Sequence, residues 1–225
     1  MTESRRGRPS GRPWAGLKAR PYRAAVMCVG LVGYAWADPS TGTATGPAMA
    51  AAEEMVRTFK AYHNEKDTMT VWTAELRAEN EKVKSRLEAI LDVPAMGKAA
   101  LTNLWSTLPA PQRVRYTDLL SGLVRKIAYP NARKFFDSFQ VTFGAEERKP
   151  DGRVLAKTTI TPLKKKDVDV EVHYLMAESG GRWRVVDVVT DGESLVLDYR
   201  NQFQKIIREK TFGGLIGKME KRLAD

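Results

Sequence analysis

Apolar side chains repeat every three or four positions from residue 48 to residue 136. In the first of these segments Met55, Val56 and Phe59 share one face, and charged residues occupy much of the remainder. This spacing is typical of amphipathic helices that bury one face against a core. The first part of the chain is therefore predicted to be helical.

Signals that start and stop helices divide this region. Asp67 is predicted to cap a long helix that ends near Ile90, and a short helix is expected over residues 98–108. The next helix opens with Pro111, which suits a first-turn position, and Pro130 is predicted to interrupt it.

Alternation of apolar and polar side chains replaces the helical spacing between residues 138 and 190. It is clearest over residues 168–176, where Asp169, Glu171 and His173 alternate with apolar side chains. Segments rich in glycine, proline and other turn residues separate the alternating runs. The pattern predicts four antiparallel strands with one buried face.

Helical spacing returns over residues 193–224, where Gly213-Gly214 is predicted to separate two helices. The order of helices, strands and helices predicts one α+β domain over residues 48–225. Helices are expected to cover one face of a curved, four-stranded antiparallel sheet.

Residues 1–37 have the composition of an export signal. A basic region ends at Arg23, an apolar run follows it, and small residues stand at Ala35 and Ala37. The apolar run is far shorter than the roughly 20 residues that span a bilayer, so a cleaved signal peptide is predicted, with Asp38 as the new N-terminus. Residues 38–47 are rich in threonine, glycine and proline and are expected to form a flexible lead-in.

The export route and the fate of Cys28 follow from the same segment. Ser4-Arg5-Arg6 hints at twin-arginine export, but Gly7-Arg8-Pro9 follows where apolar residues are expected, so general secretion is favoured. Cys28 is the single cysteine, and the large Met27 before it argues against a lipid-attachment site. After cleavage the chain is expected to contain no disulfide and no thiolate metal site.

The net charge of +10 would favour a nucleic-acid partner if it lay in the folded domain. Seven of the basic residues and a single acid, Glu3, fall within residues 1–37. This segment therefore carries +6 and the remaining chain only +4. No nucleic-acid partner is predicted.

Lys164-Lys165-Lys166 falls at a predicted hairpin turn. A run of solvated lysines at such a turn protects a sheet edge from pairing with another chain. Docking to an acidic partner or to a lipid surface is the alternative interpretation.

The chain offers no convincing set of catalytic residues. Gly192-Glu193-Ser194 looks like the start of a nucleophile elbow, but Val196 stands where the closing glycine belongs, and no histidine follows. Ser194 is instead predicted to cap the helix that begins at Leu195.

No cofactor or metal is predicted either. His63 and His173 have no further ligands at metal-binding spacing, and the acidic residues near position 190 lack the pattern of a calcium loop. A glycine-rich phosphate loop is also missing from the sequence. Asp187, Asp191 and Glu193 are instead expected to cap turns and to pair with Arg184 or Arg200. Asp187 and Arg200 in particular are predicted to form a structural pair where the sheet meets the following helix.

The last third of the chain resembles the MlaC family of periplasmic phospholipid-binding, or toluene-tolerance, proteins. The resemblance is carried by Trp183-Arg184-Val185-Val186-Asp187-Val188, by Asp191-Gly192-Glu193-Ser194-Leu195-Val196 and by Tyr199-Arg200-Asn201-Gln202-Phe203. Upstream, Trp105 and Pro111-Gln112-Arg113 are similar to the family's short helix and the opening of its next one. Two residues depart from the family pattern: Thr102, where glycine is common, and Glu193, where valine is common.

The resemblance implies a fold like that of nuclear-transport-factor-like domains with a helical extension and an internal apolar cavity. It also implies a periplasmic carrier that needs no cofactor and holds the acyl tails of a phospholipid inside. The implied partners are an inner-membrane ABC transporter with an MCE-domain subunit and an outer-membrane lipoprotein complex.

The apolar faces of the predicted strands and helices supply the candidate lining of this cavity, although a cavity wall and a solid core have the same composition. The candidates are Leu120, Leu123, Val124, Ile127, Val141, Phe143, Ile160, Val170, Val172, Tyr174, Val185, Val196, Tyr199 and Phe203.

Three alternatives stay open at the level of sequence. A carrier of another apolar molecule, such as a hopanoid, would have the same pattern. An α+β enzyme of similar shape would use His173 or Asp187 in the same cavity. An interaction module or chaperone would expose an apolar groove to proteins.

Overall fold

The computed structural model describes residues 46–65, 67–163 and 168–225. The predicted export signal, most of the lead-in and Lys164-Lys165-Lys166 lie outside these residues.

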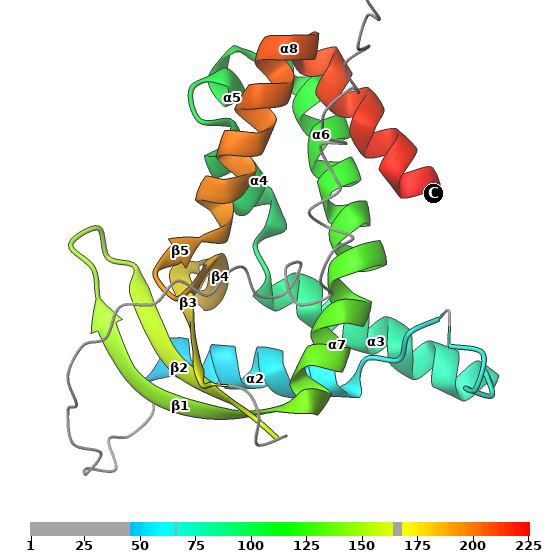
Figure 1. The fold of residues 1–225 in the computed structure, drawn as a ribbon, viewed down its shortest axis with the longest axis vertical. Coiled ribbons are helices and arrows are strands. Elements are labelled where there is room, and N and C mark those ends of the chain that lie inside the picture. Colours follow the sequence, from blue (N-terminus) through cyan, green and yellow to red (C-terminus); the bar gives the residue numbers. More distant parts are fainter. Residues whose placement is uncertain (1–45, 66, 164–167) are drawn as a thin grey trace, which may run out of the picture.

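Helices make up the first part of the described chain, as the apolar spacing predicts. They are α2 (Pro47–Ala61), α3 (Ala74–Ile90), α4 (Val93–Leu101), α5 (Leu104–Thr107), α6 (Ala110–Leu123), the π-helical turn η2 (Val124–Ala128) and α7 (Tyr129–Ser138). Figure 1 shows α2 lying along the sheet, α3 projecting away from it, and α4 and α6 standing above it.

Helix α3 begins later than its predicted cap. The hydroxyl of Thr73 accepts a hydrogen bond from the Leu76 amide at 3.2 Å and caps the helix. The carboxylate of Asp67 instead accepts from Met69 and Thr70, 3.0 Å each, and holds a turn. The prediction for Asp67 was wrong because β-branched and aromatic residues at 70–73 disfavour helix.

The short helix expected over residues 98–108 is also divided differently. Helix α4 starts earlier, where the Asp92 carboxylate accepts from the Ala95 amide at 3.0 Å, and ends at Leu101. Thr102 then adopts φ 53° and ψ −130°, which separates α4 from α5. This conformation favours glycine, and it is strained for a β-branched residue. The departure from the family pattern at this position therefore has a structural cost.

We expect Thr102→Gly to stabilise the protein by about 1 kcal/mol. Relief of the strain outweighs the greater entropy of glycine in the unfolded chain. Urea unfolding monitored by circular dichroism would measure the change. Thr102→Ala retains the Cβ and is the matched control; an equal gain from both substitutions would contradict the explanation.

Pro130 does not interrupt its helix, contrary to the prediction. Helices α6 and α7 are joined through η2, in which the Tyr129 amide bonds to the Val124 carbonyl, and they form one long rod in Figure 1. Proline carries no N–H and crowds the preceding turn of an α-helix. The wider π-turn accommodates it, so Pro130 occupies the first turn of α7.

The strands form one antiparallel sheet in the order β1-β2-β3-β4-β5. The four predicted strands are present as β1 (Phe139–Arg148), β2 (Val154–Pro162), β3 (Val170–Ser179) and β4 (Arg182–Thr190). A fifth strand of two residues, β5 (Glu193–Ser194), pairs with the end of β4. Register shifts in the β1–β2 and β3–β4 pairings accompany the curvature visible in Figure 1.

One face of the sheet is buried, as the alternation predicts. Val154, Ala156 and Ile160 of β2 and Met176 of β3 are fully buried. Helix α2 contacts β1, β2, β3 and β4 and covers this face, while α4 and α8 contact β4, and α7 contacts β1. The sheet and helices thus enclose a common hydrophobic core, and the α+β class is confirmed.

Helix α8 (Leu195–Ala224) runs up beside α4, breaks, and returns beside α6. The predicted break exists but lies at Lys210 and Thr211, just before Gly213-Gly214. A Cβ on Gly214 would lie 2.5 Å from the Cβ of Lys210, so glycine permits the close return of the chain. None of the described helices is long and apolar enough to cross a membrane.

Candidate functional site

A pocket lies where the sheet, α2, α4, the α6–η2–α7 rod and α8 meet. Its volume is about 130 Å³, and no charged side chain lines it in the described part of the chain. The walls are aliphatic and aromatic. They are formed by Met55, Phe59, Leu91, Val93, Met96, Gly97, Ala100, Leu120, Val124, Ala128, Tyr129, Ala132, Phe135, Phe136, Val172, Tyr174, Val188, Leu195, Tyr199 and Phe203.

Close packing of α4 against α6 forms one wall. A Cβ added to Gly97 would lie 2.7 Å from Leu120 Cδ2 and 3.0 Å from Tyr116 Cε1. The buried Tyr116 hydroxyl donates to the Gly97 carbonyl at 3.1 Å, and burial raises the pKa of this tyrosine. Gly97 thus lets the two helices approach and also holds the tyrosine in place.

We expect Gly97→Ala to destabilise the protein by about 1 kcal/mol, because overpacking against Leu120 and Tyr116 outweighs the better helix propensity of alanine. Thermal unfolding would measure the loss. The matched control is Gly217→Ala in α8, where nothing lies within 4 Å of the added Cβ. That control should stabilise the protein slightly, and a loss of equal size in both would contradict the packing argument.

The corner between β4 and α8 fixes the side of the pocket that α8 provides. The Asp187 carboxylate is 8% exposed and accepts hydrogen bonds from the Val188 amide at 2.8 Å, from the Val196 amide at 3.0 Å and from the Ser194 hydroxyl. The Ser194 oxygen in turn accepts from the Leu197 amide at 3.0 Å. Ser194 is therefore the helix cap that the sequence predicts, and Asp187 anchors it.

Two arginines tie this corner to α3 and α4. Arg184 donates to the Ala89 and Glu88 carbonyls and lies 3.2 Å from Asp92 Oδ2. Arg200 donates to the Ala99 carbonyl of α4 at 3.2 Å. The predicted pairing of Asp187 with Arg200 was wrong, because amide and hydroxyl donors already occupy the carboxylate.

The segments that carry the family resemblance therefore build one structural unit: a β4 carboxylate, the cap of α8 and the ties between α8 and α4. A family model described as "MlaC protein" matches residues 55–221. The chain belongs to the MlaC family.

A solved structure supports the same fold for this MlaC family member. It is the phospholipid-binding protein from Ralstonia solanacearum in complex with a phospholipid, with a TM-score of 0.54 and 22% sequence identity. The match covers 80% of this chain and 98% of that chain. No match was found among curated proteins.

Six of the predicted lining residues lie on the pocket wall. They are Leu120, Val124, Val172, Tyr174, Tyr199 and Phe203. The other eight are outside that wall and pack in or against the hydrophobic core: Leu123, Ile127, Val141, Phe143, Ile160, Val170, Val185 and Val196. Contact of any of them with a ligand stays a prediction.

Other wall residues were not among the candidates. Helix α4 provides several of them, and the sequence signal that would have found them is the Asp92 cap followed by Pro94 in the first turn. Met55 and Phe59 of α2 were recognised as an apolar face, but nothing in their spacing shows that α2 crosses the sheet beside an opening.

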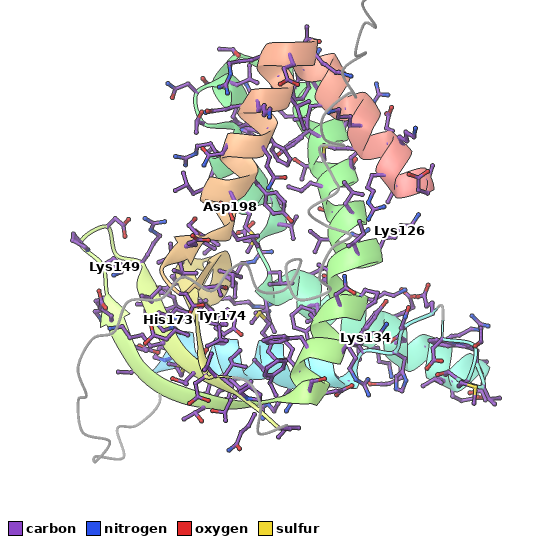
Figure 2. All side chains as sticks on the ribbon, in the orientation of Figure 1. Lys126, Lys134, Lys149, His173, Tyr174 and Asp198 are labelled. Atoms are coloured by element: carbon purple, nitrogen blue, oxygen red, sulfur yellow. The ribbon has the colours of Figure 1, made fainter. Side chains whose placement is uncertain are left out.

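Among the described residues, the acidic, basic and histidine side chains stand apart from the pocket wall. His173 Nδ1 accepts from the Thr158 amide at 3.3 Å, and neither His173 nor Asp187 lines the pocket. Partial burial, and then the nearby Glu193 and Asp187, raise the pKa of Asp198 on α8. Figure 2 shows His173, Tyr174 and Asp198 on the sheet and on α8. Within the described residues, no group of three or more His, Cys, Asp or Glu side chains is placed to hold a metal.

Proposed function

We propose that this MlaC family member is a periplasmic phospholipid carrier whose pocket holds the acyl chains of its cargo. The observation that carries the proposal is the apolar, uncharged pocket between the sheet and the helices in a chain of this family. The neighbour from Ralstonia solanacearum, which is described as phospholipid-binding, supports the same ligand class.

The energetics of hydrocarbon suit such a carrier. Each methylene removed from water contributes about 0.8 kcal/mol, so a lipid does not cross an aqueous space unescorted. A bilayer shelters the same methylenes, and the net preference for pocket over membrane is therefore small. A carrier of this kind loads and unloads without a large change in free energy.

The pocket must widen to accept two acyl chains. Its volume of about 130 Å³ is close to that of an engineered cavity of about 150 Å³ that binds one benzene. We infer that α4 and α8 move away from the α6–η2–α7 rod as the lipid enters. The break in α8 and the π-turn in the rod are the places where the backbone already departs from regular α-helix.

The proposal includes export and two membrane partners. The predicted signal sequence supports release into the periplasm with Asp38 at the N-terminus, which N-terminal sequencing of the exported protein would test. Exchange with an inner-membrane ABC transporter bearing an MCE-domain subunit and with an outer-membrane lipoprotein complex rests on the family resemblance alone.

Mass spectrometry of organic extracts tests the central claim. The full chain is produced in a Gram-negative host, purified from the periplasm without detergent and extracted. We expect about one phospholipid for each protein molecule. A hopanoid or another apolar molecule in its place would redirect the proposal, and an extract without lipid from folded protein would contradict it. The structure places neither His173 nor Asp187 in the pocket wall and so gives the enzyme alternative no specific support.

A further inference from the structure

Tyr174 differs from its surroundings in the pocket wall. It lies on β3, is 2% exposed and lines the pocket. Its hydroxyl oxygen is buried and has no hydrogen-bond partner among the described residues. Buried polar groups nearly always have such a partner, and an exception calls for an explanation.

Thr158 on the neighbouring strand is the polar side chain closest in effect to this hydroxyl, and as a hydrogen-bonding neighbour it lowers the pKa of Tyr174. The Thr158 hydroxyl donates to the Val172 carbonyl, and no hydrogen bond joins it to the Tyr174 hydroxyl in this structure. Burial is the dominant effect and raises the pKa of Tyr174, so the group is a neutral phenol that can donate a proton in a hydrogen bond. Tyr116, a buried tyrosine behind the wall, donates its hydroxyl hydrogen to the Gly97 carbonyl.

The chemistry of the pocket selects the kind of acceptor that would satisfy Tyr174. No cation lines the described pocket, so an ionised phosphate or carboxylate placed there would be buried without a counter-charge. An ester carbonyl is neutral and accepts a hydrogen bond without that penalty. In a diacyl phospholipid, ester carbonyls stand where the acyl chains begin.

We propose that the Tyr174 hydroxyl donates a hydrogen bond to an acyl-ester carbonyl of the bound lipid, and that it thereby favours ester-linked over ether-linked lipids. This inference rests on the proposed carrier function. It adds selection by a hydrogen bond to a pocket whose wall is mainly aliphatic and aromatic.

A competition between two lipids tests the assignment. Lipid-free protein is equilibrated with vesicles that contain equal amounts of dipalmitoyl-phosphatidylethanolamine and dihexadecyl-phosphatidylethanolamine, which has the same headgroup and chain length but ether linkages. Mass spectrometry of the re-isolated protein gives the ratio of the two bound lipids. The ester-to-ether ratio bound by the unsubstituted protein is divided by the same ratio for Tyr174→Phe to give a double ratio. This double ratio is independent of any difference in how readily the two lipids leave the vesicle.

We expect this double ratio to be about five in favour of the ester, which corresponds to one hydrogen bond of about 1 kcal/mol. Tyr116→Phe is the matched control: it removes a buried hydroxyl that bonds within the protein and should leave the lipid ratio unchanged. Thermal unfolding of the lipid-free proteins adds a second readout. Tyr174→Phe should leave the Tm unchanged or raise it, whereas Tyr116→Phe should lower it.

Each other outcome is decisive. A double ratio near one overturns the role of Tyr174 while the carrier function stands, because both lipids are still recovered. A Tm loss in Tyr174→Phe as large as that in Tyr116→Phe shows that the hydroxyl serves the protein and not the lipid. Recovery of neither lipid from the unsubstituted protein overturns the carrier function and this role together.

Discussion

Replacing Ala132 with tryptophan should weaken lipid binding by a factor of more than about 100 and leave the protein folded. Ala132 lies on α7, is only partly buried and lines the pocket, so a larger side chain at this position extends into the opening. An indole fills much of a pocket of about 130 Å³ and occupies the space that an acyl chain needs. The substitution therefore reduces the space available to the acyl chain. It neither creates a cavity nor buries a charge, so the fold should be retained.

The expected loss is large because it scales with the methylenes that are displaced. Excluding about four of them removes roughly 3 kcal/mol, or a factor of more than 100 in affinity. The measurement is the lipid recovered after incubation with phospholipid vesicles, together with circular dichroism to confirm the fold. Ala78→Trp, on the exposed face of α3 and outside the pocket wall, is the matched control. Full lipid loading of the Ala132 variant would show that cargo lies elsewhere.

The sequence predicts the order of elements well because each element carries its own period. The β2 alternation of Val154, Ala156 and Ile160 is a local property of the chain, and the structure buries these side chains on one face. Boundaries were less predictable where competing signals lie close together. Asp67 and Thr73 are both good cap residues, and the choice between them depends on the β-branched residues that separate them.

The pocket was only partly predictable because a core residue and a wall residue have the same chemistry. Val172 lines the opening, while Ile160, on the same face of the next strand, is fully buried in the core. The difference arises from how α2, α4 and α8 cross the sheet, which depends on contacts between residues distant in sequence. Arg200 illustrates this limit, since its acceptor is the carbonyl of Ala99 and not the predicted Asp187.

Asp187 holds the corner on which the α8 side of the pocket depends, so Asp187→Ala should be strongly destabilising. The substitution leaves the buried Val196 amide and the Val188 amide without their acceptor and removes the anchor of the Ser194 cap. A buried donor that loses its partner costs about 1 to 3 kcal/mol, and bonds to a charged group are at the upper end. We expect a loss of about 3 kcal/mol or more in the free energy of unfolding, a large share of the 5 to 15 kcal/mol typical of a domain.

Urea unfolding of a graded series would test this role of Asp187. Ser194→Ala removes the cap but keeps the carboxylate on both amides, and should cost about 1 kcal/mol. Asp169→Ala, at an exposed position just before β3, should change stability by no more than about 0.5 kcal/mol. Because Leu195, Tyr199 and Phe203 enter the pocket from the helix that Asp187 anchors, the Asp187 variant should also retain less lipid even where it is folded. Equal stability of the Asp187 and Asp169 variants would mean that α8 is held by its apolar contacts alone, and the corner would then have no part in shaping the pocket.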